Sequence, residues 1–235
     1  IYKHVLNVAI LSAIIAGQMG FSVGRINLLV KSAILHDIGA LKLQQLPDAE
    51  DLDDGTKEVV KKNTQETLDR YGDLDEEVLR LITQMQELYT RESDAEIPAG
   101  LKESVNANIL YVADAYDRMT AMKSFEEPTS EVKAVRELLA DEERYNKKIV
   151  NALIHGISIL YPGVCVELSN GEKGLVITEN EDNIFEPTVL DFRNNNLYDL
   201  SDPSVKQTIE IADVMKTMDN RIKLDKSLLE EYQAN

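Results

Sequence analysis

The sequence of 235 residues contains one cysteine, no tryptophan and only three histidines. A single cysteine, Cys165, excludes an intrachain disulfide, which suits a reducing compartment, and we expect a cytoplasmic location. Basic residues are also scarce: 25 Lys and Arg stand against 42 Asp and Glu, a formal net charge of -17. A surface of this sign repels nucleic acids and anionic lipid, so we expect neither DNA nor RNA as a partner.

Long hydrophobic runs are absent too. No uncharged stretch approaches the roughly 18 residues that a membrane span needs, so no insertion of this segment into a membrane is expected. The apolar stretch from Val5 to Ile15 lacks the basic start and the small-residue cleavage site of a signal peptide. The sequence begins with Ile1 rather than Met, and we expect upstream domains, a sensor among them, to be missing from it.

Apolar residues recur at helical spacing through the first two thirds of the sequence, which predicts a helical domain over 1–160. Alternating apolar residues from Val164 to Leu168 precede an Asn-Gly pair, which is a hairpin signal. Residues 161–200 are therefore expected to form a small antiparallel β module. The fold class is mainly α, a helical bundle followed by this module and by a C-terminal helix.

The C-terminal helix is expected within 201–235, from about Pro203 to Gln233, because apolar residues follow one another there in steps of three and four. Such a stripe usually packs on its own domain, and the alternative is that it forms the interface of a homodimer. Further upstream, Ser22 is expected to cap the second helix, and Asp73 with Glu76 is expected to form a capping box.

His36-Asp37 is the sharpest chemical feature, at the end of an apolar helix in LLVKSAILHDIGALKL. Imidazole and carboxylate groups both suit divalent transition metals. Such a pair alone is common, and the alternative is a buried helix end in which Asp37 is hydrogen-bonded and His36 packs.

Two more residues add weight to a metal site. His4 lies upstream on the polar side of the first apolar helix, and Asp114 lies inside an apolar helix, in ILYVADAYDRMTA. A carboxylate on a core-facing helix is costly unless it is paired or bound to a metal. Each residue alone has a plainer interpretation, a surface histidine and a capping aspartate. Together with His36 and Asp37 they offer a ligand set for one divalent ion, such as Fe, Mn, Ni or Mg.

The order and helical context of these four residues match the H…HD…D pattern, and the sequence resembles the HD-GYP family, bacterial phosphodiesterases acting on cyclic di-GMP. The resembling blocks are KHVLNVAILSAIIAG, KSAILHDIGALKL, NANILYVADAYDRMTAMKSF and PAGLK. The β unit resembles the module that often follows this domain, so the resemblance covers most of residues 1–192. It implies an HD-type helical bundle, metal ligation by the four residues, a catalytic role for Asp37 and a cyclic dinucleotide or other phosphate ligand.

The sequence departs from that family where further metal ligands are expected. After His36 the next histidine is His155, so the family's three intervening histidines are absent. Where the family has a histidine after two lysines, this sequence has Asn63. The family's two adjacent histidines correspond to Leu88 and Tyr89. These changes remove the ligands of a second metal ion.

Residues that would bind phosphate also differ. The Lys that usually follows H-D-I-G is Ala40, and the G-Y-P triplet reads Glu96-Ile97-Pro98. The two basic residues after the late Asp become Lys123 and Glu126. We expect Lys123 to attract phosphate and Glu126 to repel it. Losing cationic groups lowers the electrostatic stabilisation of a transition state, so weak or no cyclic di-GMP hydrolysis is expected.

Three interpretations remain at this point. The first is a catalytically degenerate HD-GYP-like domain that acts as a signalling or binding module with at most one metal ion. The second is a mononuclear metal-dependent phosphohydrolase with an altered substrate, and the third is a structural helical domain with no metal. Three other features are assigned structural roles: His155 is expected to pack in a helix, Cys165 to lie in a strand, and the acidic run over 48–54 to form a solvated loop.

Overall fold

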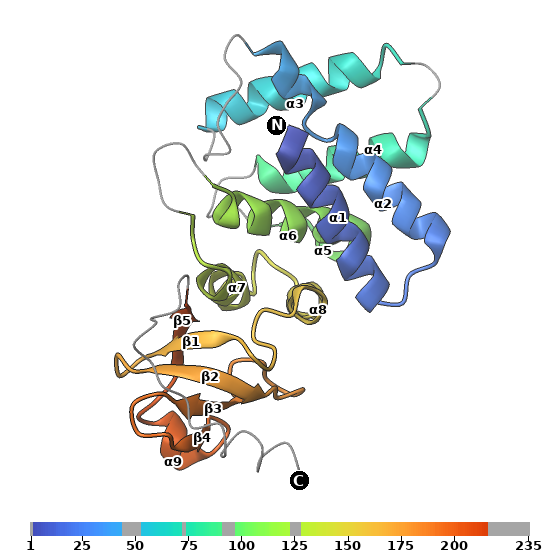
Figure 1. Ribbon diagram of the computed structural model, residues 1–235. Coiled ribbons are helices and arrows are strands. Elements are labelled where there is room, and N and C mark those ends of the chain that lie inside the picture. The colour runs from blue at the N-terminus through green and yellow to red at the C-terminus, as the bar shows by residue number, and fades with distance from the viewer. Residues whose placement is uncertain (1, 44–52, 72–73, 91–96, 123–127, 216–235) are drawn as a thin grey trace. The chain divides into compact units, whose positions relative to one another are not determined.

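The computed structural model describes residues 2–43, 53–71, 74–90, 97–122 and 128–215. These residues divide into two compact units, which are described one at a time. The first unit comprises 1–129 and 134–157 and is helical, and the second comprises 130–133 and 158–235 and contains a β-sheet (Figure 1). The predicted fold class, a helical domain followed by an antiparallel β module, is confirmed.

The helices of the first unit are short and are joined mostly by polar segments. Their bounds are α1 Tyr2–Gln18, α2 Val23–Leu35, the 3₁₀ helix η1 Ile38–Lys42, α3 Asp54–Leu68, α4 Glu76–Tyr89, α5 Ala99–Glu103, α6 Val105–Thr120 and α8 Lys147–Ile157. Helix α7, Glu131–Ala140, belongs to this unit from Ala134 onward. No helix in the described part of the chain is long and apolar enough to cross a lipid bilayer.

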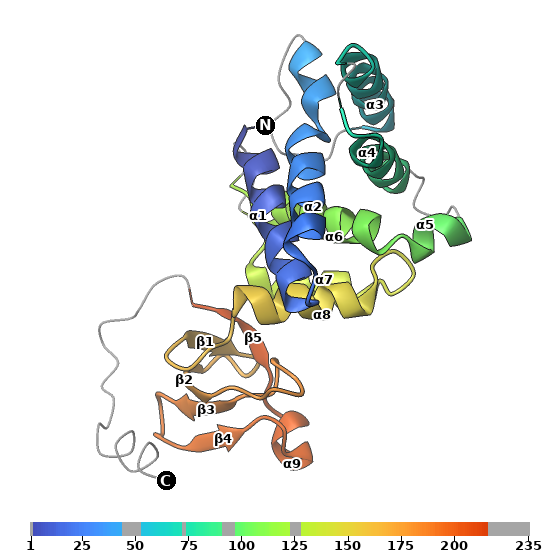
Figure 2. The same cartoon turned by 90° about the vertical axis from the view of Figure 1, so that its right-hand side faces the viewer.

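Helix α6 lies at the centre of this unit, and it explains why a polar site can form there. α1 and α2 lie side by side and α6 passes across them, while α4 packs on α2 and on α6 (Figure 2). Ile109 and Leu110 of α6 are fully buried, together with Leu29 of α2 and Ile82 of α4. Side chains on this face of α6 therefore meet α1 and α2 in the core.

Helix caps agree with the sequence only in part. Ser22 occupies the N-cap position of α2, but its side chain makes no capping hydrogen bond. The expected capping box is wrong, because Glu76 is the first residue of α4 and Asp75 is its N-cap. The Asp75 carboxylate accepts a hydrogen bond from the backbone N–H of Glu77, which satisfies a free donor of the first turn. Asp73 lies outside the described residues.

The second unit is built on a five-stranded antiparallel sheet. Its strands are β1 Cys165–Leu168, β2 Lys173–Thr178, β3 Thr188–Asp191, β4 Leu197–Asp199 and β5 Ile211–Val214, in the order β4-β3-β2-β1-β5. The Asn-Gly pair predicted as a turn joins β1 to β2, and Gly171 there has φ 82°, a conformation that glycine adopts at little cost.

The helix predicted from Pro203 to Gln233 is wrong in the part that the structure describes. A one-turn helix, α9 (Pro203–Lys206), is followed by β5, which pairs with β1 through Val166 and Val214. Ile211 is fully buried in this strand. Pairing with a free sheet edge, which joins residues far apart in the sequence, overrides the local helical spacing. Residues 216–235 of the predicted helix lie outside the described residues.

Candidate metal centre

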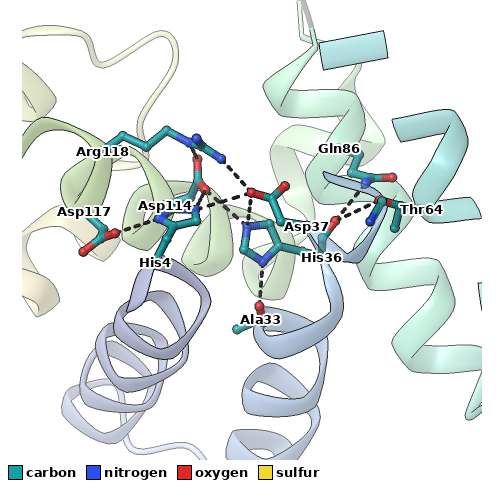
Figure 3. Close-up of polar contacts among 10 residues, drawn as sticks. His4, Ala33, His36, Asp37, Thr64, Gln86, Asp114, Asp117 and Arg118 are labelled. Atoms are coloured by element: carbon teal, nitrogen blue, oxygen red, sulfur yellow. Dashed lines mark hydrogen bonds and ion pairs between the residues drawn. The ribbon is translucent and has the colours of Figure 1, made fainter. Parts of the chain in front are cut away.

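The structure brings together the four residues that were singled out as metal ligands (Figure 3). His4 lies in the first turns of α1, His36 caps the C-terminus of α2, Asp37 follows it, and Asp114 lies in the middle of α6. His36 and Asp114 are each 1% exposed, and His4 and Asp37 are 6% and 7% exposed. The expectation that His4 lies on the polar side of its helix is wrong, because it shares the buried face of α1 with Val8.

His4 uses both ring nitrogens. Its Nδ1 lies 2.7 Å from Asp117 Oδ2, and its Nε2 lies 2.9 Å from Asp114 Oδ1. Asp117 is itself held, because Asn7 Nδ2 donates a hydrogen bond of 2.7 Å to its Oδ1. With Nδ1–H donating to the Asp117 carboxylate, His4 Nε2 faces Asp114, and it donates to that carboxylate when the ring is protonated.

His36 is arranged in the same way. Its Nδ1–H donates to the backbone carbonyl of Ala33 at 2.6 Å. Its Nε2 lies 3.3 Å from Asp114 Oδ1 and 3.7 Å from Asp37 Oδ2. Within the described chain this buried Nε2 makes no hydrogen bond of its own. A buried imidazole nitrogen without a hydrogen bond, turned toward two carboxylates, fits a metal ligand.

These donor atoms fit a divalent ion. One ligand atom from each of His4, His36 and Asp114 lies within 4.8 Å of the others, and Asp37 Oδ2 is 3.7 Å from both Nε2 atoms. Two imidazole nitrogens and carboxylate oxygens form a common ligand set for Zn, Fe, Mn or Ni. Fixing each ring through Nδ1 orients Nε2 for such an ion.

Arg118 adds a cation that the sequence analysis missed. Its Nε donates to Asp114 Oδ2 at 2.9 Å and its Nη2 donates to Asp37 Oδ2 at 3.1 Å. The Arg118 side chain is 10% exposed, and its guanidinium lies 4.6 Å from the centre of the Tyr89 ring. The two oxygens of Asp114 are thus divided between the histidines on one side and Arg118 on the other.

The spacing on α6 was the available signal for the missed residues. Asp117 and Arg118 follow Asp114 by three and four residues, which places them on the same helix face. Asn7 stands in the same relation to His4 on α1. Spacing along a helix shows only that these side chains are close to the candidate ligands. Which atoms they contact depends on their rotamers, which the sequence does not show.

The charges of the cluster are strongly coupled. Burial opposes a charge on His4, but its hydrogen bonds to Asp114 and Asp117 outweigh this and raise its pKa to about 9. Burial likewise opposes a charge on His36, and the negative charges of Asp37 and Asp114 raise its pKa. For Asp114, the attraction of Arg118 and the two histidines overcomes burial and holds its pKa well below the ordinary value. Without a metal ion, protons and Arg118 therefore balance the carboxylates.

The segment after α2 is anchored from two neighbouring helices. Gln86 Nε2 of α4 donates to the carbonyl oxygen of His36 at 2.9 Å, and Thr64 Oγ1 of α3 lies 3.4 Å from the same oxygen (Figure 3). The backbone N–H of Gly39 donates to Thr64 Oγ1 at 3.0 Å. These contacts fix the turn that carries His36 and Asp37.

The remaining sequence candidates lie elsewhere. Lys123, the expected phosphate-binding residue, and Glu126 are outside the described residues. Tyr89, at an expected tandem-histidine position, lies against Arg118, whereas Leu88 is buried. The expectation that His155 packs in the core is wrong, because this residue is exposed on α8.

Two comparisons show what the chain is similar to. The sequence profile described as HD domain matches residues 1–119, which contain all four candidate ligands. A protein named cyclic di-GMP phosphodiesterase PdeB, from Borreliella burgdorferi, is 24% identical over 218 residues. That alignment covers 88% of this chain but 56% of the relative, so the chain spans little more than half of that protein's length.

Proposed function

Because the chain belongs to the HD domain family, we propose that it binds one divalent metal ion and recognises a phosphoester, with cyclic di-GMP as the first ligand to test. The proposed metal ligands are His4, His36, Asp37 and Asp114. Within this proposal the domain is a divergent relative of the HD-GYP phosphodiesterases. Its hydrolysis is impaired, and it serves as a signalling or binding module.

The convergence of the two imidazole Nε2 atoms on Asp114 Oδ1 is the observation that carries the proposal. They lie 2.9 Å and 3.3 Å from that oxygen, in a setting where each Nδ1 is already hydrogen-bonded. Two buried histidines that only packed would not need to turn both Nε2 atoms to the same carboxylate. A bound divalent ion would supply positive charge for a phosphoryl oxygen.

The chain's own residues would position the ligand and exclude water. Arg118 holds Asp37 and Asp114 in place and neutralises part of their charge. Asp37 is the less buried of the two candidate ligand carboxylates, and it remains our candidate catalytic residue. Impairment is supported by the sequence, which has no histidine between His36 and His155 to bind a second ion.

A mononuclear phosphohydrolase is the second candidate function, and the complete four-residue cluster favours it. The two candidates differ in turnover. Protein purified without chelator would be loaded with Mn, Fe, Ni or Mg, its metal content measured, and cyclic di-GMP and a panel of phosphoesters tested for binding and hydrolysis. For the binding module we expect about one equivalent of metal and ligand binding with little hydrolysis.

Asp37→Asn separates the candidates. Phosphoester hydrolysis that disappears in this variant, but persists in a variant of the exposed Glu87 (Glu87→Gln), supports the enzyme. Rapid cyclic di-GMP hydrolysis with two metal equivalents contradicts impairment. A metal content below about a tenth of an equivalent after loading rejects the metal site and leaves a structural domain, because tight sites fill stoichiometrically.

The context of the domain belongs to the same proposal. A role in signal transduction, a sensor domain upstream, a homodimer and a cytoplasmic location are all expected from the sequence and its resemblance. The named relative supports the cyclic dinucleotide as a ligand class.

A further inference from the structure

A cavity of about 370 Å³ adjoins the candidate metal centre in the first unit. It reaches Asp114 at one end and is lined by side chains from α3, α4, α6 and α7 and from the segment before α8. The side chains that give the cavity its chemistry are Lys57, Arg118, Arg144, Tyr89, Tyr111 and Tyr145. The cavity thus carries three basic side chains against two acidic ones, Asp114 and Glu137, in a chain with 25 basic and 42 acidic residues.

Two of the basic residues are brought together by one aromatic ring. Lys57 Nζ lies 5.2 Å from the centre of the Tyr89 ring, and the Arg118 guanidinium lies 4.6 Å from it. Lys57 also pairs with Asp54 at 3.1 Å, but the Asp54 side chain is 73% exposed, so this pair is weak. Lys57 is 19% exposed and can turn into the cavity at little cost.

The third cation is Arg144. Among the described residues, neither a hydrogen bond nor an ion pair holds the guanidinium of Arg144; only its backbone N–H is bound, to Asp141 at 3.0 Å. Arg118 uses Nε and Nη2 for the two carboxylates, and no partner within the described ranges takes its Nη1. A guanidinium has five N–H donors, so both arginines retain donors for a ligand.

The uncharged groups of the cavity add further donors. Tyr111 and Tyr145 stack with ring centres 5.3 Å apart, and burial raises the pKa of both phenols, so they keep their protons near neutral pH. Of the two carboxylates that line the cavity, Asp114 is already engaged by the histidines and Arg118, and Glu137 is exposed. The ligand that this surplus of donors and positive charge fits is an anion made of acceptor oxygens, and a phosphoryl group is such an anion.

We propose that this cavity is a phosphoryl-binding subsite in which Lys57, Arg118 and Arg144 hold the oxygens of a substrate or product phosphate beside the candidate metal centre. The identity of the phosphoester rests on the proposed function. The subsite itself rests on fixed side-chain charges, so it binds phosphate without a metal ion. Arg118 joins the two sites, because it contacts both candidate ligand carboxylates and lines the cavity.

The test is calorimetric titration of the metal-free protein in EDTA with inorganic phosphate, and separately with guanosine monophosphate and cyclic di-GMP. We expect saturable phosphate binding by the wild type. Lys57→Gln and Arg144→Gln each remove one charge-assisted contact, so each should weaken phosphate binding about tenfold or more. Matched controls are Lys62→Gln on the same helix α3 and Lys148→Gln on α8, both exposed and outside the cavity, and these should bind as the wild type does.

Thermal unfolding of each variant checks that it is folded, and both cavity variants change partly exposed side chains. Equal phosphate binding by all variants, or none by the wild type, overturns the subsite. The proposed function fails separately: phosphate binding that needs Lys57 and Arg144 in a protein that takes up no metal rejects the metal centre and leaves the subsite standing. Metal uptake without phosphate binding rejects the subsite and leaves the metal centre standing.

Discussion

At the scale of single residues, Asp114 holds the cluster together. Its Oδ1 lies 2.9 Å from His4 and 3.3 Å from His36, and its Oδ2 accepts from Arg118. It is 1% exposed, so these partners rather than bulk water balance its charge. Removing a buried carboxylate that has three donors around it therefore destabilises the whole network by more than the loss of any one contact would.

Asp114→Asn should therefore abolish metal uptake. The amide keeps the shape but removes the negative charge, so an ion loses a ligand and the pKa of His4 falls from about 9. Elemental analysis after loading measures the first effect, and titration of the histidine ring signals by NMR measures the second. Glu87→Gln, an exposed change on α4, serves as the control.

Asp117→Asn should have a smaller effect on metal binding. Asp117 contacts His4 Nδ1 at 2.7 Å, whereas the other candidate ligands face His4 Nε2. Loss of such an orienting partner typically lowers metal affinity 10–100-fold without abolishing it. In Mn titrations, Asp117→Asn should bind Mn more tightly than Asp114→Asn does. The reverse order of affinities would contradict the assignment of Asp114 as a ligand.

The dependence on pH should have opposite signs for stability and for metal uptake. The pKa of His4 is raised from 6.5 in the unfolded chain to about 9 in the fold, so its stabilisation is fully present below pH 6.5 and is lost as the pH rises through 9. Urea unfolding in EDTA should show metal-free wild type losing up to about 3 kcal/mol between pH 6.5 and 9.5 relative to His4→Gln.

Metal uptake runs the other way, because an ion must displace the proton of His4. Mn affinity should rise about tenfold for each pH unit between 6.5 and 9 if one proton is released. A flat affinity over this range would show that His4 is not a ligand.

The sequence predicted the four-residue cluster from the cost of Asp114 inside an apolar helix, from the His36-Asp37 pair and from the match of all four residues to the H…HD…D pattern. Asp117 and Arg118 were missed for the opposite reason: polar residues at the end of a helix are usually exposed. Only the crossing of α6 over α1 places Asp117 behind His4, and that crossing angle is not visible in the sequence. Whether the cluster binds a metal stays a prediction.

At the scale of elements, the contact between η1 and α3 positions His36 and Asp37. A Cβ built on Gly39 would lie 2.3 Å from the backbone nitrogen of Thr64 and 2.3 Å from the backbone oxygen of Val60. Because these are backbone atoms, which cannot rotate away, α3 can approach the turn this closely only with glycine at position 39.

Gly39→Ala should destabilise the protein by about 1–3 kcal/mol, because α3 must move away from the turn. It should also weaken metal binding by shifting the carbonyl that Thr64 and Gln86 hold. Gly17→Ala is the matched control: no atom lies within 4 Å of its Cβ position on α1, and alanine favours the helix by about 0.5–1 kcal/mol. Urea unfolding of both variants checks the prediction, which fails if Gly39→Ala is as stable as Gly17→Ala.

Elements defined by local periodicity were predicted well, and elements defined by distant partners were not. The hairpin of β1 and β2 followed from alternation and an Asn-Gly turn. By contrast, Ile211–Val214 becomes a strand because β1 offers an edge, and no pattern within 201–235 indicates that edge.

At the scale of the whole molecule, all four candidate ligands lie in the first of the two units. A ligand stabilises the structure that binds it, by about 2.7 kcal/mol at a concentration 100 times its Kd. Saturating Mn should therefore raise the melting temperature of the transition that belongs to the helical unit by about 5–10 °C. Differential scanning calorimetry measures this, and Asp114→Asn should show no shift.

The net charge of -17 determines which phosphates reach the cavity. Extended polyanions meet repulsion over most of the surface, whereas a small phosphoester interacts mainly with the nearby cations. From the composition we expect no nucleic-acid partner, but the composition does not indicate the cavity with Lys57, Arg118 and Arg144, which only the fold brings together.

The long sequence separation within the centre has a consequence for the order of events in the cell. His4 and Asp114 are 110 positions apart, and His36 lies between them in sequence. A chain growing on the ribosome presents His4 and His36-Asp37 early, but the cluster cannot close until α6 has emerged. If these four residues bind an ion as proposed, the complete ligand set is available only once α6 has left the ribosome, and the segment that carries His4, His36 and Asp37 cannot supply it alone.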